Sequence, residues 1–264
     1  VQRMTACLEH RGPDGSGVWA RGPVALGHRR LSIIDLSTMG AQPMVDSHLG
    51  LSVAFNGMIY NHRQLREQLT GAGHRFFSTS DTEVVLKAFH AWGQDAWQRL
   101  HGMFAVVVHE RDTGRVTLAR DRFGIKPLYL AQTRGGLRFG SSLPALICDP
   151  EVDRSIDLMA LDHYLSWHAV VPPPLTLLKG VRKLPPGSSL SIDGEGEGTL
   201  HTWWQLSVQA DPELAALPVR EREDMVEQAL RTAVQRRALA DVPVGVLLSG
   251  GVDSSLIVAL LAEM

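Results

Sequence analysis

The sequence lacks the features that would place it in several large classes of protein. It has only 2 cysteines, Cys7 and Cys148, in 264 residues, which is too few for a disulfide framework or a cysteine zinc site. The formal net charge of −2 argues against a surface that binds nucleic acid. No histidines lie in an HExxH pattern, and no apolar run reaches the length of a membrane span. Together with the lack of a signal peptide, this predicts a cytoplasmic protein with neither nucleic acid nor a membrane as a partner.

Both ends of the sequence have patterns that suggest continuation. The first residue is Val1, and residues 1–12 have the pattern of the last turns of a helix. Residues 256–264 have the pattern of an apolar helix, with no segment after it that would bury it. We therefore expect an internal fragment of a longer protein.

Most of the chain has the pattern of short strands with two helices laid over them. Ser80 and Glu83 have the spacing of a capping box that opens the second helix. The expected elements are strands at 24–35 and 51–61, helices at 62–73 and 81–93, and a hairpin over 103–121 that turns at 112–114. A glycine-rich hairpin tip followed by a linker is expected over 191–218.

The pattern changes after Pro218. A helix over 221–239 precedes a strand over 244–248, a glycine loop and a final helix. This alternation is typical of the opening of an α/β domain with a parallel sheet. About 45 residues cannot bury a core of their own, so we expect most of this second domain to lie outside the sequence.

The glycine loop SGGVDSS, at 249–255, has the pattern of a phosphate-binding loop. Glycines let the backbone approach a phosphate, and the N-terminus of the following helix offers free N–H groups. No lysine follows the glycines, as it does in loops that serve γ-phosphoryl transfer, so a departing pyrophosphate is the expected ligand. Asp253 would repel bare phosphate, which predicts a Mg²⁺ ion between them. The alternative is a glycine-rich turn with serine caps.

This loop resembles the pyrophosphate loop of the N-type ATP pyrophosphatases. In that family a carboxylate attacks the α-phosphate of ATP, which gives an acyl-adenylate and magnesium pyrophosphate. The resemblance implies that the backbone of Leu247 contacts adenine. The predicted ATP-binding set is Leu247, Ser249, Gly250, Gly251, Asp253, Ser254 and Ser255, with Asp253 as the metal ligand and ATP and Mg²⁺ as cofactors.

Several segments before this loop resemble the class II glutamine amidotransferases. They are HRGPDGSG (10–17), GHRRLSIIDLS (27–37), GAQPM (40–44), FNGMIYN (55–61) and STSDTEVVL (78–86). The segment 102–130, which contains RDRFGIKPLYL, resembles the asparagine synthetase branch. The resemblance implies an α+β four-layer αββα sandwich of the N-terminal-nucleophile hydrolase type over 1–205. Residues 206–264 would be a linker and the truncated start of an α/β parallel-sheet ATP-pyrophosphatase domain.

The resemblance also implies a site that takes ammonia from glutamine, a reaction that needs a nucleophile, an oxyanion hole and clamps for the amino-acid ends. Arg30 would bind the α-carboxylate of glutamine and Asp81 its α-ammonium group. The Asn56 side chain and the Gly57 N–H would form the oxyanion hole. The backbones of two further residues complete the predicted glutamine-binding set, which is Arg30, Ile34, Asn56, Gly57, Met58 and Asp81.

Each of these residues also has a plain structural interpretation. Arg30 is then a surface cation, and Asp81 is a favourable charge in the first turn of a helix. The Asn56-Gly57 pair is then a type I′ hairpin turn.

Two positions depart from the family pattern. The family nucleophile is a cysteine at the mature N-terminus, whose own α-amine serves as the base, and this sequence has no such residue. Cys7 would lie inside the first helix of the family and is not the nucleophile, and Cys148 is expected to be a small buried residue. Met58 stands where asparagine synthetases usually have glutamate, which puts the ammonium pocket in doubt.

Three functions remain open. The first is an ATP-dependent, glutamine-hydrolysing amide ligase that converts aspartate to asparagine, with glutamine, ATP and the carboxylate acceptor as partners and a homodimer as the expected assembly. Met58 and the segment 163–187 are similar to N-acetylglutaminylglutamine amidotransferase, which would make an acylated dipeptide the acceptor. The third is a non-catalytic glutamine or nucleotide binder.

Overall fold

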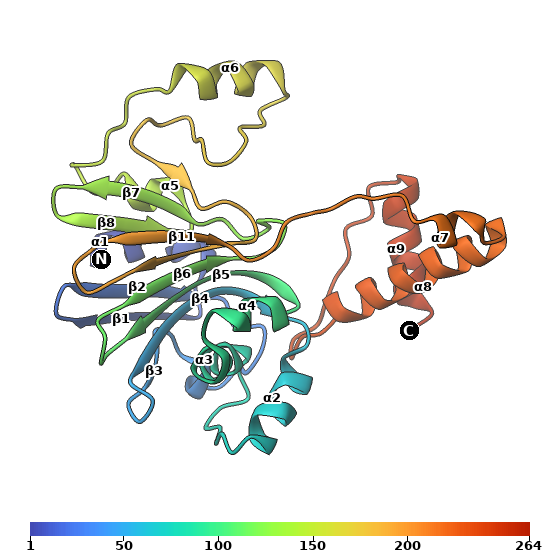
Figure 1. Cartoon of the computed structure of the whole chain (residues 1–264), viewed down its shortest axis with the longest axis horizontal. Helices are drawn as coiled ribbons and strands as arrows, with labels where there is room; N and C mark the ends of the chain where they lie inside the picture. The colour runs from blue at the N-terminus through green and yellow to red at the C-terminus, as the bar shows by residue number, and fades with distance from the viewer. The chain divides into compact units, whose positions relative to one another are not determined.

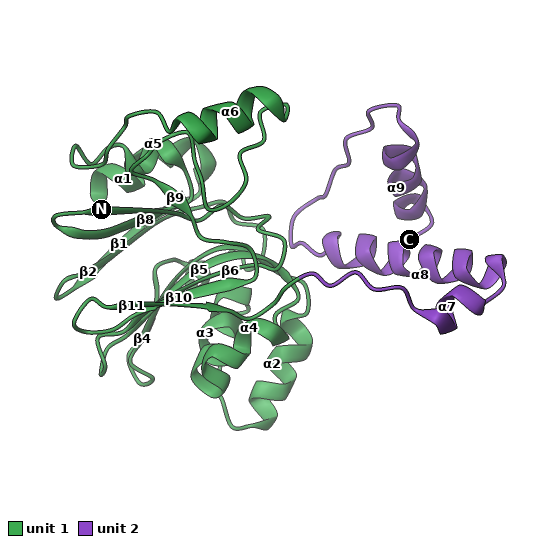
Figure 2. Cartoon of the chain, turned by 45° about the horizontal axis from the view of Figure 1, so that its top comes forward, with its two compact units in different colours: residues 1–205 green, residues 206–264 purple.

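The computed structural model describes all residues from 1 to 264. The chain divides into two compact units, Val1–Gln205 and Leu206–Met264 (Figure 2). Each is described by itself below.

The first unit contains most of the secondary structure (Figure 1). Its strands are β1 (Gly15–Arg21), β2 (Val24–Arg30), β3 (Met44–Asp46), β4 (Leu51–Ile59), β5 (Gly102–Glu110), β6 (Val116–Arg120), β7 (Tyr129–Thr133), β8 (Gly136–Gly140), β9 (Arg182–Lys183), β10 (Ser188–Ile192) and β11 (Gly198–Thr202). Its helices are α1 (Gln2–Ala6), α2 (His62–Gly71), α3 (Asp81–Trp92), α4 (Ala96–Arg99), α5 (Leu143–Leu146) and α6 (Leu158–Ser166). Short 3₁₀ turns are η1 (Glu9–Arg11), η2 (Thr38–Gly40) and η3 (Gly93–Asp95).

These strands form three antiparallel sheets. The largest has the strand order β11-β10-β6-β5-β4-β3, and the other two are β1-β2 and β8-β7-β9. The pairing of β4 with β5 is continuous, from Leu51 opposite Glu110 to Ile59 opposite Gly102. The hairpin predicted over 103–121 forms. The hairpin tip predicted within 191–218 also forms, between β10 and β11, with Ile192 opposite Gly198.

The sheets and helices of this unit make four layers. Helices α2, α3 and α4 cover one face of the large sheet, and the two smaller sheets lie over its other face (Figure 2). Helices α1 and α5 pack outside the smaller sheets. Along β5, Phe104, Val106 and Val108 enter the core under the helices, whereas Ala105 and Val107 enter the core between the sheets. The central strand is therefore buried on both faces.

Local sequence signals explain the helices that cover the large sheet. Leu65 and Leu69 lie one turn apart on α2 and are both buried. Ser80 caps α3 by accepting a hydrogen bond from the Thr82 N–H at 3.1 Å. The second half of the predicted capping box is wrong, because the Glu83 carboxylate accepts from the N–H groups of Phe77 and Ser78. Glu83 is fully buried, and its hydrogen bonds hold the segment before α3 rather than the first turn of α3.

The second unit is helical. It contains α7 (Pro212–Ala216), α8 (Val219–Arg237) and α9 (Val252–Ala262). The strand predicted over 244–248 does not form, and Leu247 is 95% exposed. A strand needs a neighbour for its backbone groups, and residues 206–264 contain no other strand. No helix in either unit is both long and apolar enough to cross a membrane.

Replacing Phe104 with alanine tests the doubly buried strand. Phe104 is fully buried and lies 6.4 Å from the Trp97 ring and 6.1 Å from the Trp203 ring, measured between centroids. We expect Phe104→Ala to lower the free energy of unfolding by about 3–5 kcal/mol, as measured by urea denaturation. Val45→Ala, on the exposed edge strand β3, should change it by less than about 0.5 kcal/mol. Equal losses from the two variants would contradict this description of the core.

Candidate functional site

Five of the six predicted glutamine-binding residues come from three elements that meet at one edge of β4, and the sixth, Ile34, lies in the loop after β2. Arg30 ends β2, Asn56 and Gly57 lie within β4, and Asp81 begins α3. The Asp81 carboxylate accepts a hydrogen bond from the Ile59 N–H at 3.0 Å. Burial raises the pKa of Asp81, and the positive charge of Arg30 acts in the opposite direction and lowers it. The structure thus brings residues from distant segments together.

Asn56 and Gly57 are paired strand residues and do not form a hairpin turn. Asn56 lies opposite Ala105, and Gly57 lies opposite Phe104, so the type I′ interpretation is wrong. A Cβ on Gly57 would lie 2.2 Å from the Met103 carbonyl oxygen. Glycine is therefore required here because β5 approaches too closely for any side chain.

The backbone of Gly57 points toward the outer edge of β4. The N–H and C=O of Phe104, which lies opposite Gly57, bond to Asp121 on the other side of β5. A strand directs the backbone groups of alternate residues to the same edge. The Gly57 N–H thus points the same way as those of Phe55 and Ile59, which bond to the side chains of Gln42 and Asp81.

The Asn56 side chain offers an unused donor. Its Nδ2 atom is buried and donates to no acceptor of the chain. Buried amide donors are normally paired, and an unpaired one costs about 1–3 kcal/mol. Asn56 also lines a cavity of about 810 Å³. An unpaired donor in a cavity wall is suited to binding the oxygen of a ligand.

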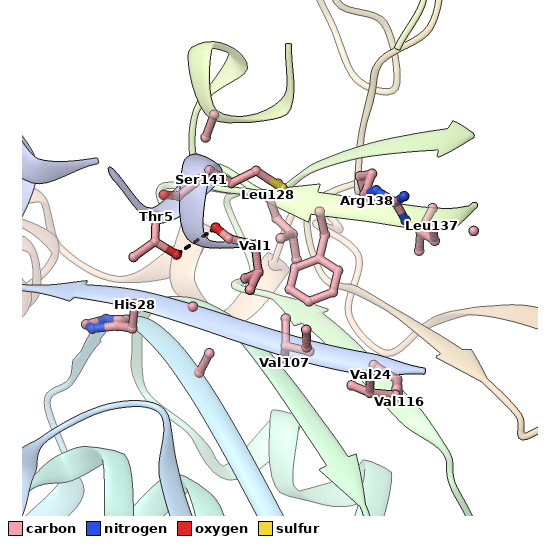
Figure 3. Close-up of a pocket in the computed structure, with 18 of the residues that line it drawn as sticks. Val1, Thr5, Val24, His28, Val107, Val116, Leu128, Leu137, Arg138 and Ser141 are labelled. Carbon is pink, nitrogen blue, oxygen red and sulfur yellow. Dashed lines mark hydrogen bonds between the residues drawn. The ribbon is translucent and has the colours of Figure 1, made fainter. Parts of the chain in front are cut away.

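The cavity lies between β2 and β8 (Figure 3). Val24, Val107, Val116 and Leu128 supply an apolar wall. The polar lining includes His28, Arg138, Asn56 and Thr5, and the Thr5 hydroxyl donates to the Val1 carbonyl at 3.0 Å. A mostly apolar cavity with a few polar groups is the usual form of a small-molecule site. Asn56 is the one residue of the predicted glutamine-binding set that lines it, and the arginine and aspartate clamps, Arg30 and Asp81, lie outside its lining.

Arg30 is not a free surface cation. Its guanidinium donates to the carbonyls of Ser37 (2.7 Å), Ile34 (3.3 Å) and Asp35. The guanidinium fixes the loop that follows β2, and the Ile34 backbone takes part in the site through this contact. Two of the five guanidinium N–H groups remain for a carboxylate.

Asp81 and Met58 lie at the buried side of the site. Asp81 is 6% exposed, and Met58 is 8% exposed and lies opposite Met103 of β5. Asp81 also occupies the first turn of α3, so its plain structural interpretation and its predicted role in binding are both compatible with its position.

Two polar residues that organise the site, Asp35 and Gln42, were given no role by the sequence motifs, although both lie in the segments that carry the resemblance. The buried Asp35 accepts hydrogen bonds from Ser37 and from the Thr79 N–H at 2.8 Å, which ties the loop after β2 to the start of α3. Burial opposes ionisation of Asp35, but these hydrogen bonds outweigh it and lower its pKa. Gln42 accepts from the Phe55 N–H at 2.7 Å and donates to the Thr82 hydroxyl at 3.1 Å, so it joins β4 to α3.

His28 is a third residue that the sequence analysis missed. Its Nε2 atom lies 3.1 Å from the Phe55 carbonyl oxygen, and its buried Nδ1 has no partner in the chain. Burial lowers its pKa from 6.5 to about 4; the bond to Phe55 opposes this shift and the charge of Arg30 adds to it. Neutral His28 therefore carries its proton on Nε2, where it can donate to the carbonyl.

The pKa of Asp81 is shifted in the opposite direction to that of His28. Burial raises its pKa from 3.8 to about 6, against the lowering effects of the hydrogen bonds from Ile59 and Thr82 and of the Arg30 charge. Burial thus disfavours the charged form of both His28 and Asp81.

Most residues of the predicted phosphate loop, 249–255, are exposed to solvent. Gly250 has a φ of +84°, and α9 begins two residues later. The hydroxyls of Ser254 and Ser255 donate to the Gly251 carbonyl at 3.0 Å and 2.8 Å. These bonds run from the serine hydroxyls back to a carbonyl, and no side chain caps the N–H groups of α9, so the serine-cap interpretation is wrong. The binding of pyrophosphate stays a prediction. The Ser249 and Ser254 hydroxyls lie 3.0 Å apart.

Asp253 is exposed in the first turn of α9. No group of three or more His, Cys, Asp or Glu side chains in the chain is arranged to hold a metal ion. One free carboxylate nevertheless fits Mg²⁺, which is commonly held by one or two carboxylates together with substrate phosphates.

Cys148 is not the buried residue that the sequence predicts. Both cysteines are partly exposed, and their sulfur atoms lie 2.6 Å apart. Cys148 follows the short helix α5 at the surface of the outer layer and therefore keeps part of its area in solvent.

The four layers are those of an αββα sandwich of the N-terminal-nucleophile hydrolase type. A glutamine phosphoribosylpyrophosphate amidotransferase from B. subtilis has a TM-score of 0.55 at 16% identity, over 99% of this chain and 61% of that one. A structure described as the allosteric regulatory enzyme of purine biosynthesis has a TM-score of 0.51 at 22% identity, over 69% of this chain and 35% of that one. These likenesses support the fold alone.

The chain belongs to the glutamine amidotransferase domain family, whose pattern matches residues 1–204. Residues 225–264 match the asparagine synthase family. Glutamine-hydrolysing asparagine synthetases 3 and 1 of Bacillus subtilis are 33% and 37% identical, over 99% and 100% of this chain and 42% and 40% of theirs. Asparagine synthetase B of Escherichia coli is 33% identical over 97% of this chain and 40% of its own length. The chain therefore spans about two fifths of these relatives.

The pKa shifts of His28 and Asp81 predict that the free energy of unfolding depends on pH, and substituting each residue singly reveals its part of this dependence. Between pH 4 and 6.5 unfolded His28 binds more protons than folded His28, so its contribution to stability falls as the pH is lowered. Between pH 3.8 and 6 folded Asp81 binds more protons than unfolded Asp81, so its contribution rises as the pH is lowered. The two effects oppose each other in the native chain.

We expect Asp81→Asn to lose about 2 kcal/mol of unfolding free energy between pH 6.5 and 4, relative to the native chain. His28→Asn should show the opposite change, a relative gain on acidification below pH 6. Urea denaturation at a series of pH values measures both. The double variant is the control and should follow the native profile. If the two single variants had parallel profiles of unfolding free energy against pH, the opposing pKa shifts would be refuted.

Proposed function

We propose that this chain is part of a glutamine-dependent amide ligase of the asparagine synthetase type. Residues 1–205 would release ammonia from glutamine. Residues 206–264 would form the first part of the domain that activates a carboxylate with ATP. The observation that carries the proposal is the buried, unpaired Nδ2 of Asn56 beside Gly57, on the wall of a cavity. The matches to the glutamine amidotransferase and asparagine synthase families over 1–204 and 225–264 support it.

The release of ammonia is an acyl transfer that passes through an oxyanion. Asn56 Nδ2 and the Gly57 N–H, which points to the open edge of β4, are the donors that would stabilise it. The two remaining N–H groups of Arg30 would bind the α-carboxylate of glutamine, and ionised Asp81 its α-ammonium group. Neither cysteine supplies the nucleophile, since in the family this is an N-terminal cysteine. Residues 1–205 therefore supply the oxyanion hole and the clamps of this site.

The synthetase reaction would use the loop at 249–255. Backbone N–H groups at the start of α9, together with the hydroxyls of Ser249, Ser254 and Ser255, would hold the departing pyrophosphate. Asp253 would share a Mg²⁺ ion with the phosphates, and the Leu247 backbone would contact adenine. The bound Mg²⁺ ion would neutralise the charge that develops on the leaving group.

The acceptor is proposed to be aspartate, because the relatives reported above are named asparagine synthetases. An acylated dipeptide is the second candidate, on the basis of Met58, where a carboxylate is absent from the buried side of the glutamine site. We also propose that the enzyme acts in the cytoplasm, where glutamine and ATP are abundant, and that it assembles as a homodimer.

Arg30→Ala separates the use of glutamine from synthesis. In the complete enzyme, loss of a bidentate, charge-assisted contact should cost about 2–4 kcal/mol of glutamine binding, so the KM for glutamine rises at least tenfold. Synthesis from free ammonia should persist, since ammonia bypasses this site. The matched control is Arg29→Ala, because Arg29 bonds the Gly12 carbonyl and Glu9. Equal losses with glutamine and with ammonia would mean that Arg30 acts only by holding residues 34–37.

The products of ATP cleavage test the function of the loop. The complete enzyme should release AMP and pyrophosphate, as followed with ATP labelled at the α- and γ-phosphates. Asp253→Asn should slow synthesis by about 10²–10³ and leave glutamine hydrolysis intact. Glu263→Gln, at the other end of α9, is the control and should have little effect on either rate. Stoichiometric ADP as the product would rule out this mechanism.

A further inference from the structure

Two cysteines that are far apart in sequence meet at the outer layer of the first unit. Cys7 terminates α1, and Cys148 follows α5. They are 141 positions apart, and their Sγ atoms lie 2.6 Å apart. They are the only cysteines of the chain, so neither thiol has a competing partner within it.

The packing of the unit holds the pair together without a covalent bond. Met4 of α1 packs against the core cluster that contains Leu146 of α5 and Val152. The segment after α5 is fixed by Asp149, whose carboxylate accepts from Arg138 Nε at 2.7 Å. The sulfur atoms are therefore placed by an apolar core and an ion pair that do not depend on their oxidation state.

Both thiols remain accessible to reagents in solution. Each cysteine is partly exposed, and Cys148 also lines the cavity that Asn56 lines. The hydrogen bond with Cys148 raises the pKa of Cys7, and burial adds to this effect. Since the thiolate is the attacking form, the reaction of Cys7 is expected to accelerate as the pH rises.

We propose that Cys7 and Cys148 are a redox-reactive pair, which a low-molecular-weight disulfide converts reversibly into an intramolecular disulfide. One cysteine thiolate attacks a sulfur atom of the small disulfide and releases a small thiol. The second thiolate then attacks the protein sulfur of this mixed disulfide and releases the second small thiol. The two cysteines lose two electrons and two protons, and the small disulfide gains them.

The bond would join α1 to α5 and close a loop of 141 positions. Cross-linking so long a loop restricts the unfolded chain and stabilises the folded one. The outer wall of the cavity, to which Arg3, Met4 and Ala145 belong, would be fixed at the same time. This inference is independent of the proposed function, because it concerns neither Asn56 nor the loop at 249–255.

The experiment treats the purified, reduced chain with oxidised glutathione over a series of pH values. Intact mass should fall by the mass of two hydrogens, and peptide mapping should recover one cross-linked pair that contains Cys7 and Cys148. The midpoint of thermal unfolding should rise by about 5–10 °C, and dithiothreitol should reverse the change. The rate of cross-linking should increase with pH.

The single variants Cys7→Ser and Cys148→Ser are matched controls. Each should gain one glutathione without the cross-link and without the rise in the unfolding midpoint. Native chain that carries glutathione on both cysteines, or that forms only intermolecular disulfides, would overturn the proposal. A cross-link that leaves the unfolding midpoint unchanged would overturn the stabilising role assigned to it.

Discussion

The close pairing of β4 with β5 at Gly57 is the constraint on which the rest of the site depends. The Met103 carbonyl leaves no room for a Cβ at this position, and β5 is itself buried on both faces. Neither strand can therefore shift without disturbing two cores. This rigidity fixes the Asn56 side chain and the Gly57 N–H in space. A rigid strand positions polar groups with higher precision than a loop could.

The outer edge of β4 is free for other contacts because β3 is short. Strand β3 pairs only with residues 51–53 of β4. Beyond that point the backbone of Phe55 bonds to the side chains of Gln42 and His28, and the Ile59 N–H bonds to Asp81. Segments far apart in sequence therefore converge on one edge, since each satisfies a backbone group that a longer β3 would have satisfied. The cost of a buried, unpaired backbone group explains why polar side chains gather there.

The two predicted ligand sites differ in how their polar groups are held. Around β4, burial keeps His28 neutral, raises the pKa of Asp81 and leaves the Asn56 amide unpaired. In the loop at 249–255 the serine hydroxyls bond to the Gly251 carbonyl, and most residues are exposed. Groups that are already desolvated interact with a ligand more strongly than solvated groups do.

Sequence patterns that act over a few residues predicted the local structure well. Leu65 and Leu69 marked the buried side of α2, and Ser80 marked the start of α3. Glu83 was assigned to the N-terminus of its own helix, because spacing alone cannot show that the preceding segment competes for its carboxylate. The strand predicted over 244–248 failed for a related reason, since pairing depends on a partner that residues 206–264 do not provide.

The motifs identified the residues of the site, but only the tertiary structure decided their arrangement. The sequence by itself determined the family and most helices and hairpins, because these depend on motif order and on neighbours within a few positions. It left Asn56-Gly57 open between a turn and a strand, and it assigned no role to Asp35, Gln42 or His28. It also gave no sign that Cys7 and Cys148 would meet. These outcomes depend on contacts between segments tens of residues apart, which the packing of the layers creates and which no local pattern records.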